Sequence, residues 1–284
     1  IVSFGPDSNS KHPTTYFRTT VNIPDPSLFF NLRVKYDDGI AIYINGVDNL
    51  RQNLSTSATF NSYANGTVSD EADWKDFTLP RTELVPGLIG YWPFDSSSQI
   101  ESGTVFDLVA GIKGEVMGGT TATQGHLDGA VDFGKAPAFN WISVAAGQKG
   151  GWLKPASDAN ALTVSLWQKL HTRVSSSTFW FGAESAPSGQ RNFQAHIPWG
   201  GGDIFFDTGG CCGGGDTRIN KGSDIDYAEW HHFVFLKNGD HKEIWIDGEL
   251  FHEGENTTPL FDDWTALGIG SNNAGGSNVA GIVD

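Results

Sequence analysis

The chain has 284 residues, with 18 Lys or Arg against 33 Asp or Glu, so its formal net charge is −15. This charge repels nucleic acid and anionic membranes and suits salty surroundings or divalent cations. Thirty-six glycines, twelve prolines and a 12% share of aromatic residues favour short strands and tight turns over helices. We therefore expect an all-β protein that neither binds nucleic acid nor inserts into a membrane, since no apolar run reaches the ~18 residues of a membrane span.

The strand-rich regions are separated by "LPRTELVPGLIGYW", in which Pro80 and Pro86 bracket a polar connection. We predict two β-sandwich domains of jelly-roll type in tandem, residues 1–86 and 87–284. The first carries 7 basic and 10 acidic residues and the second 11 and 23, so their net charges are −3 and −12. A cation site is therefore expected in the second domain.

The first region alternates apolar and polar residues in "TTYFRTTVNI" and "LFFNLRVKYDDGIAIYINGV", a pattern that predicts strands with one buried face. Asp38-Gly39 and Asn45-Gly46 predict tight turns, so Leu32–Tyr36, Ile40–Ile44 and a strand from Val47 form a meander of hairpins. The stretch "YDDGIAIYING" resembles galactose-binding-like and protective-antigen-like jelly rolls. That resemblance implies an accessory module that acts as a spacer or docking partner.

The second region contains an ordered series of motifs: "GLIGYWPFDSSS", "VFDLVAGIKGEV", "GHLDGAVDFG", "ALTVSLWQKL", "EWHHFVFLKNGDHKEIWIDGEL", "LGIGSNN" and "AGIVD". In that order they resemble a laminin-G-like, concanavalin A-like domain. The resemblance implies a sandwich of two curved antiparallel sheets, in a superfamily of lectins, pentraxins, adhesion modules and some glycan hydrolases.

The residues of this region support a sandwich independently of the resemblance. Asp247-Gly248 predicts a two-residue hairpin between "EIWI" and "ELFHE". Aromatic residues at strand spacing are expected in the core: Trp92, Phe94, Phe133, Trp167, Trp230, Phe233, Phe235 and Trp245.

Catalysis is not expected. Laminarinase-like relatives place their carboxylates two residues apart on one strand, because retaining hydrolysis needs carboxyl groups roughly 5–5.5 Å from each other. In "EIWIDGE" the spacing is wrong, since Asp247 is followed by a turn glycine and Glu249 lies on the next strand. Neither G-x-S-x-G nor H-E-x-x-H occurs.

Calcium is the expected cofactor, in a structural role. Concanavalin A-like relatives often hold it with an acidic residue of the first strand, a backbone carbonyl and an Asp of the closing strand. The resemblance assigns these positions to Asp95, Gly114 and Asp284. The alternative is that Asp95 only caps the serine-rich turn that follows it.

A carbohydrate site is predicted between Arg191 and Arg218, where aromatic and polar residues are dense. Sugars are held by aromatic faces together with a few fixed polar groups. Alternation puts Asn192, Gln194 and His196 on one sheet face and Phe193 on the other. The predicted ligand-binding residues are Gln194, His196, Trp199, Asp207, Cys211, Cys212 and Arg218.

The adjacent pair Cys211-Cys212 lies among five glycines. Neighbouring α-carbons are about 3.8 Å apart, below the usual disulfide range, so a bond between them needs distorted backbone that glycines can absorb. We predict a vicinal disulfide that forms a rigid knob beside the sugar site. Two reduced thiols and a pair of metal thiolates are the alternatives.

Together these features predict a non-catalytic carbohydrate-binding or adhesion segment of a larger secreted or cell-surface protein, with a polysaccharide or glycoconjugate as its partner. Two alternatives stay open. One is a structural block of a surface layer or fibre, which would contact other copies or neighbouring β-domains, and the other is a polysaccharide hydrolase.

Overall fold

The computed structural model describes residues 13–19, 30–44, 47–55, 57–68, 73–79, 87–137, 139–211, 217–272 and 275–284. Strands make up 44% of the chain and helices 8%, which confirms the all-β prediction. The chain divides into two compact units, residues 1–88 and 89–284. The sequence predicts the domain boundary after residue 86.

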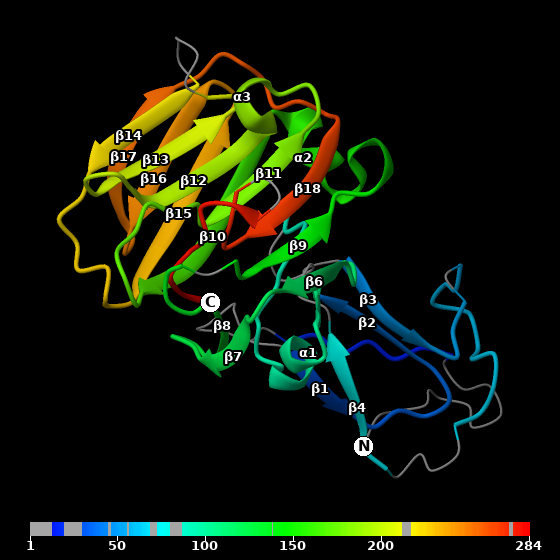
Figure 1. Cartoon of the computed structure of the whole chain (residues 1–284). Helices are drawn as coiled ribbons and strands as arrows, with labels where there is room; N and C mark the ends of the chain where they lie inside the picture. The colour runs from blue at the N-terminus through cyan, green and yellow to red at the C-terminus, as the bar shows by residue number, and fades with distance from the viewer. Residues whose placement is uncertain are drawn as a thin grey trace. The chain divides into compact units, whose positions relative to one another are not determined.

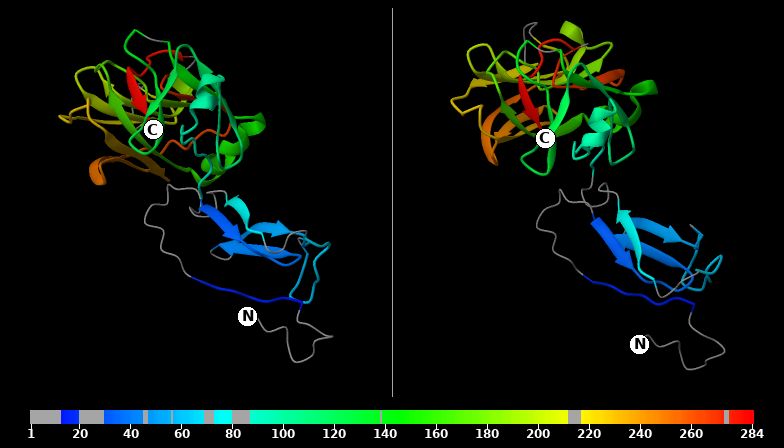
Figure 2. Two further views of the ribbon diagram at one scale, coloured as in Figure 1. Left: turned by 90° about the horizontal axis from the view of Figure 1, so that it is seen from below. Right: turned by 60° about the horizontal axis from the view of Figure 1, so that its bottom comes forward.

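Two antiparallel strand pairs form the described part of the first unit. These strands are β1 (Phe30–Val34), β2 (Ile40–Ile44), β3 (Val47–Gln52) and β4 (Lys75–Leu79). They lie close together in both views of Figure 2. The predicted antiparallel pairing of β2 with β3 is confirmed, and the turn predicted at Asn45-Gly46 lies outside the described residues. The predicted meander is wrong at its start, because β1 pairs with β4. A bidentate ion pair from Arg33 to Asp76, 2.6 Å at its shorter contact, joins β1 to β4.

The second unit is a sandwich of two antiparallel sheets (Figure 1). The seven-stranded sheet has the order β17-β16-β15-β10-β19-β8-β7, and the eight-stranded sheet has the order β14-β13-β12-β11-β18-β9-β6-β5. The strands are β5 (Thr104–Phe106), β6 (Lys113–Met117), β7 (Thr121–Gln124), β8 (Gly129–Asp132), β9 (Trp141–Ala145), β10 (Ala161–Leu170), β11 (Phe179–Ala183), β12 (Arg191–Trp199), β13 (Asp203–Thr208), β14 (Arg218–Gly222), β15 (His231–Asn238), β16 (His241–Ile246), β17 (Glu249–Glu255), β18 (Trp264–Ile269) and β19 (Gly281–Val283).

Short helices connect some of these strands: α1 (Ser97–Glu101), the 3-10 helix η2 (Gln148–Leu153), α2 (Lys154–Ala159) and α3 (Pro187–Gln190). The Ser96 side chain caps α1 by accepting a hydrogen bond from Gln99 N. No helix in the described part of the chain is long and apolar enough to cross a membrane.

The predicted hairpin at Asp247-Gly248 is confirmed. It joins β16 to β17, and both turn residues have positive φ, 51° for Asp247 and 82° for Gly248. Asp tolerates the left-handed region better than most residues and glycine adopts it freely. The sequence therefore fixes the register of this edge of the seven-stranded sheet.

Phenylalanines from both sheets meet in the core. Phe193 and Phe206 lie with their ring centroids 4.8 Å apart, and Phe235 of the other sheet lies 5.4 Å from Phe206. Full burial of one such side chain stabilises the fold by about 1.5–3 kcal/mol. The expected core positions Phe94, Phe133, Phe233 and Phe235 are confirmed, and Trp92 packs against the core while partly exposed.

Three of the tryptophans predicted in the core lie outside it. Trp167, Trp230 and Trp245 are partly exposed and do not belong to the core cluster. On β10 the inward positions are taken by Leu162, Val164, Leu166 and Leu170, so Trp167 faces outward by alternation. The prediction failed because aromatic content alone does not reveal which of two alternating sets faces the core.

Candidate functional site

Most of the predicted ligand-binding residues lie on the outer face of the eight-stranded sheet. Gln194 of β12 is directly opposite Asp207 of β13, and Asp207 is directly opposite Arg218 of β14. Phe193 is fully buried in the core, as alternation predicted. The three polar residues therefore form one row that runs across the strands.

Asp207 is the centre of this row and is completely buried. Arg218 donates to both of its carboxylate oxygens, Nε to Oδ1 at 2.5 Å and Nη2 to Oδ2 at 2.6 Å. Nη1 of Arg191 and Nε2 of His196 lie 3.8 and 3.7 Å from Oδ2. Burial opposes the charge of Asp207, but Arg218 and His196 outweigh it and hold its pKa below the usual value. Asp207 is therefore an ionised anchor for the basic groups above it.

Aromatic side chains continue outward from this anchor. The ring centroid of Trp199 lies 4.6 Å from that of His196, and Phe205 lies 6.2 Å from His196 on the next strand. The guanidinium of Arg218 lies 4.6 Å above the Phe205 ring. Trp199, Phe205 and Arg218 are partly exposed, whereas His196 is buried. We call these residues, with His196 and Asp207 beneath them, the tryptophan–arginine patch.

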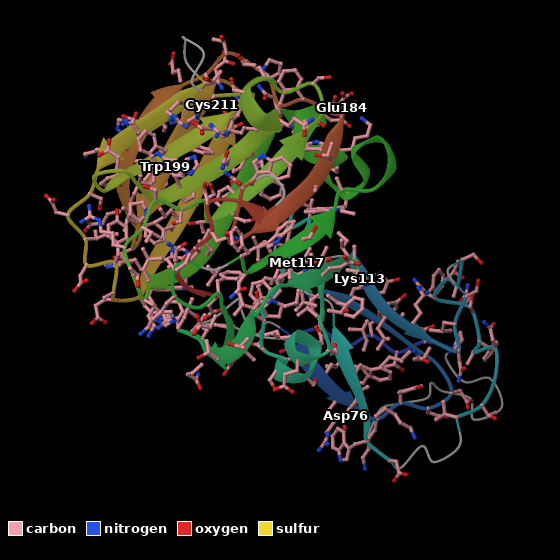
Figure 3. The ribbon with its side chains drawn as sticks, in the orientation of Figure 1. Asp76, Lys113, Met117, Glu184, Trp199 and Cys211 are labelled. Carbon is pink, nitrogen blue, oxygen red and sulfur yellow. The ribbon has the colours of Figure 1, made fainter. Side chains whose placement is uncertain are left out.

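Cys211 lies at the other end of the same sheet surface from Trp199, as Figure 3 shows. Gly210 N donates to Arg191 O at the start of β12, whereas Trp199 ends that strand. The Cys211 side chain is buried, and its sulfur accepts hydrogen bonds from Arg191 and, at 3.2 Å, from Arg218. Arg218 and Asp207 therefore connect Cys211 to the patch. Cys212 lies outside the described residues, and the vicinal disulfide stays a prediction.

The polar groups beneath the patch form a hydrogen-bonded network. Gln194 Nε2 donates to Ser177 Oγ at 2.9 Å, and Ser177 Oγ lies 3.0 Å from His196 Nδ1. Asn192 exchanges two hydrogen bonds with the backbone of Phe261 and is buried under that loop. Gln194 and Asn192 therefore position other groups from inside the protein.

Ser177, His196 and Asp207 have the residue types of a hydrolase triad. A nucleophile must reach its substrate, and Ser177 is completely buried. The 3.7 Å separation of His196 Nε2 from Asp207 also exceeds hydrogen-bond length. The chain of contacts therefore holds the imidazole in place beneath Trp199.

Two contributors to this face were missed in the sequence. Phe205 shares a strand face with Asp207, a relation that alternation in "DIFFDT" would have revealed. Trp180 of β11 lies directly opposite Gln194 and continues the row towards Gly268 of β18. Trp180 Nε1 and Gln194 Oε1 are buried with no hydrogen-bond partner in the described part of the chain. The predicted site thus extends one strand further than expected.

The predicted calcium ligands are only partly brought together. Asp95 Oδ1 accepts a hydrogen bond from Gly129 N at 3.0 Å, and Asp284 Oδ2 accepts one from Leu127 N at 2.8 Å. Both carboxylates therefore hold the turn between β7 and β8. Gly114 lies in β6 of the eight-stranded sheet, opposite Val105 and Val144. No group of three or more His, Cys, Asp or Glu suited to a metal occurs among the described residues, so backbone carbonyls would have to complete a site.

The turn supplies such carbonyls beside Gly125. A β-carbon built there would lie 2.5 Å from Gly129 O, 2.6 Å from Asp284 Oδ2 and 2.8 Å from Leu127 O. Three oxygens thus lie around the side of Gly125 that has no side chain, and carboxylate and carbonyl oxygens are the donors that a hard cation takes. Burial, with the charge of Asp95 as a further cause, raises the pKa of Asp284 to about 6. A cation at this point would relieve that unfavourable carboxylate.

Comparison with known proteins finds a family model that matches part of the second unit. Residues 147–284 match the family model of the concanavalin A-like lectin/glucanases superfamily. The matched stretch, 138 of the 284 residues, resembles a concanavalin A-like domain. Among curated proteins no significant match is found. The predicted resemblance is therefore confirmed over residues 147–284.

Several solved structures match this chain at low identity. Trypanosoma rangeli sialidase in complex with 2,3-difluoro-KDN matches with a TM-score of 0.52 and 13% identity, over 70% of this chain and 30% of the sialidase. Domain 4 of AbnA, a GH43 extracellular arabinanase from Geobacillus stearothermophilus in complex with arabinotriose, matches with a TM-score of 0.46 and 17% identity, over 63% of this chain and 82% of that domain. The CBM40 of Ruminococcus gnavus IT-sialidase bound to α2,3-sialyllactose matches with a TM-score of 0.41 and 9% identity, over 54% and 85% of the two chains.

Carboxylates of the concanavalin A-like domain that resemble a laminarinase motif have local partners. Glu243 Oε2 accepts from Trp245 Nε1 at 2.6 Å, and its Oε1 lies 2.8 Å from His241 Nε2. Asp247 Oδ2 lies 2.7 Å from His231 Nδ1. Each carboxylate therefore fixes an aromatic or imidazole ring on the seven-stranded sheet.

Proposed function

We propose that the concanavalin A-like domain is a non-catalytic carbohydrate-binding module of a secreted or cell-surface protein. The observation that carries the proposal is the tryptophan–arginine patch. Its partly exposed Trp199 and Phe205 offer apolar faces, and Arg218 is oriented by a buried carboxylate. Aromatic faces with a few convergent polar groups suit a sugar ring. The family description, which names lectins and glucanases, agrees with this chemistry.

Orientation of Arg218 is central to the proposed site. Its bidentate pair with Asp207 leaves little rotational freedom to the guanidinium. A polar group fixed before the ligand arrives loses less entropy on binding. Arg218 would then donate to sugar hydroxyls while the sugar ring lies against Trp199 or Phe205.

A glycan array, followed by calorimetry with the best ligand, tests the proposal. Trp199→Ala should weaken binding by about tenfold or more, equivalent to ~1.4 kcal/mol. Phe139→Ala is the matched control, because Phe139 is also exposed, at 78%, in the same unit but outside the patch. Equal binding by wild type and Trp199→Ala would contradict the assignment. Release of sugars from laminarin, agar or xylan would instead favour the hydrolase alternative.

We also propose that a structural calcium ion binds beside Gly125. The supporting observation is the convergence of Asp284 Oδ2 with the carbonyls of Leu127 and Gly129. Asp95 lies close enough to raise the pKa of Asp284 and would add a second carboxylate. When bound, the ion supplies a link between the turn and the end of the domain's closing strand.

A further inference from the structure

A second aromatic cluster lies on the outer face of the seven-stranded sheet. His126, in the turn between β7 and β8, stacks on Trp167 of β10 with ring centroids 3.6 Å apart and an interplanar angle of 19°. Trp230, which precedes β15, stands at 63° to the His126 ring with centroids 6.1 Å apart. The rings of His126, Trp167 and Trp230 therefore form one contiguous cluster. We call His126, Trp167, Trp230 and the adjoining Lys169 the histidine–tryptophan corner.

The corner is held rigidly from below. Leu127 N and Gly129 N donate to the carboxylates of Asp284 and Asp95, so the backbone on the C-terminal side of His126 is fixed. Trp167 also contacts His232, with ring centroids 5.0 Å apart, and His232 Nε2 lies 2.8 Å from Ser165 Oγ. Ordering such a surface is costly in side-chain entropy. In a binding site this order increases affinity, because the side-chain entropy is already lost before the ligand binds.

Polar groups in the corner point to a hydroxyl-rich ligand. His126 is exposed, and within the described part of the chain its ring nitrogens make no hydrogen bond. A neutral imidazole can donate from one nitrogen and accept at the other. The Lys169 ammonium lies 5.1 Å from the centroid of the Trp230 ring and adds further donors. An apolar ring face beside fixed donors and acceptors is the arrangement that suits a sugar.

The negative charge around the corner favours neutral sugars over acidic ones. Asp128 lies in the turn that carries His126. The second region as a whole has a net charge of −12, from 11 basic and 23 acidic residues. An acidic sugar would be repelled here. We propose that the histidine–tryptophan corner is a second carbohydrate-binding site, specific for neutral sugar units.

The two sites lie on different sheets of one sandwich, because the tryptophan–arginine patch is built on β12, β13 and β14. The inference therefore goes beyond the proposed function: one domain would hold two glycan segments on opposite faces. Two linked weak sites give avidity for a polysaccharide that a single site lacks. Such a domain would also cross-link separate chains.

Calorimetry with laminari-, xylo- and arabino-oligosaccharides tests the second site directly. Wild type should bind about two short oligosaccharides per chain, and Trp230→Ala should bind about one. His126→Ala should give the same result and guards against misfolding of the tryptophan variant, because His126 is an exposed turn residue. Phe139→Ala is again the control and should keep both sites.

Two of the possible outcomes separate the two proposals. One site that is lost in Trp199→Ala but kept in Trp230→Ala and His126→Ala overturns the second site and leaves the proposed function intact. One site that is lost in Trp230→Ala but kept in Trp199→Ala supports the second site and overturns the first. Absence of binding by wild type to every oligosaccharide overturns both.

Discussion

Asp207 shows how one buried charge organises the outer face of a sheet. Its carboxylate is sealed from solvent and is shared by Arg218, Arg191 and His196. Breaking a buried ion pair by removing one partner costs about 3–5 kcal/mol, because the other charge stays buried. The stability of this face and the orientation of Arg218 therefore depend on the same residue.

We predict that Asp207→Asn lowers the unfolding free energy by about 3 kcal/mol at neutral pH. The folded-state pKa of Asp207 is lowered, so its stabilising contribution is present above the unfolded-state pKa and is lost as pH falls through the folded-state value. Urea unfolding near neutral pH and near pH 3 measures both effects. The difference between wild type and variant should shrink in acid, and a constant difference would contradict the ionised role of Asp207.

Lys242 gives a prediction at alkaline pH. It is fully buried on β16, where Nζ donates to Phe206 O at 2.9 Å and Thr217 O at 3.0 Å. Burial lowers its pKa from 10.5 to about 7. Between those values the unfolded chain binds a proton that the folded chain does not, so stability rises with pH. From about pH 7 to pH 9 this group should add about 2 kcal/mol.

Lys242→Met should remove that rise, which urea unfolding at the two pH values measures. Lys113→Met is the control, because the Lys113 side chain is 54% exposed. An unchanged pH slope in Lys242→Met would show that the lysine keeps its ordinary pKa.

Strand β13 has one face that packs in the core and an opposite face that belongs to the tryptophan–arginine patch. Phe206 is fully buried between Phe193 and Phe235, whereas its neighbour Phe205 is partly exposed beneath Arg218. The two residues are adjacent, so they face opposite sides of the sheet. One strand therefore carries a core residue and a patch residue of the same type.

Phe206→Ala should lower the unfolding free energy by about 3–5 kcal/mol, because it leaves a cavity in the core. Phe205→Ala should cost less than about 1.5 kcal/mol but weaken glycan binding by several-fold. Denaturant unfolding and calorimetry on the two variants measure the contrast. Similar losses of stability in both would contradict the facing of β13.

In the second unit, the turn between β7 and β8 joins two segments that are distant in sequence. It is contacted by Asp95, before α1, and by Asp284, after β19. These residues are distant in sequence, and a ligand that links them is bound only by the folded chain. Cation binding at Gly125 should therefore stabilise the whole domain.

Calcium at saturating concentration should raise Tm by several degrees and a chelator should reverse the shift, since about 1 kcal/mol moves Tm by roughly 2–4 °C in a domain of this size. Asp95→Asn should abolish most of the calcium response. Glu115→Gln is the control, because the Glu115 side chain is 62% exposed. If calcium leaves the Tm of wild type unchanged, the proposed calcium site is wrong.

The sequence by itself determined the all-β class, the two regions and many local elements. Asp247-Gly248 specified its hairpin because few other dipeptides accept positive φ at both positions. Alternation along "RNFQAHIPW" placed Phe193 in the core, and composition located the polar residues of the patch. These features depend on neighbouring residues, whose geometry a short stretch of sequence fixes.

Tertiary structure alone decided which distant residues meet. The pairing of β1 with β4, and the placing of Asp284 against the turn at Leu127, join segments through long-range contacts that local periodicity does not encode. Trp167 and Phe179 each lie on a strand whose side chains alternate between the two faces of its sheet. Only the packing of the two sheets decides that Phe179 is buried in the core while Trp167 stacks on His126. The row from Trp180 through Gln194 and Asp207 to Arg218 exists because strand register brings four strands into line. Register follows from burial of one whole face of the sheet, a property of the assembled sandwich.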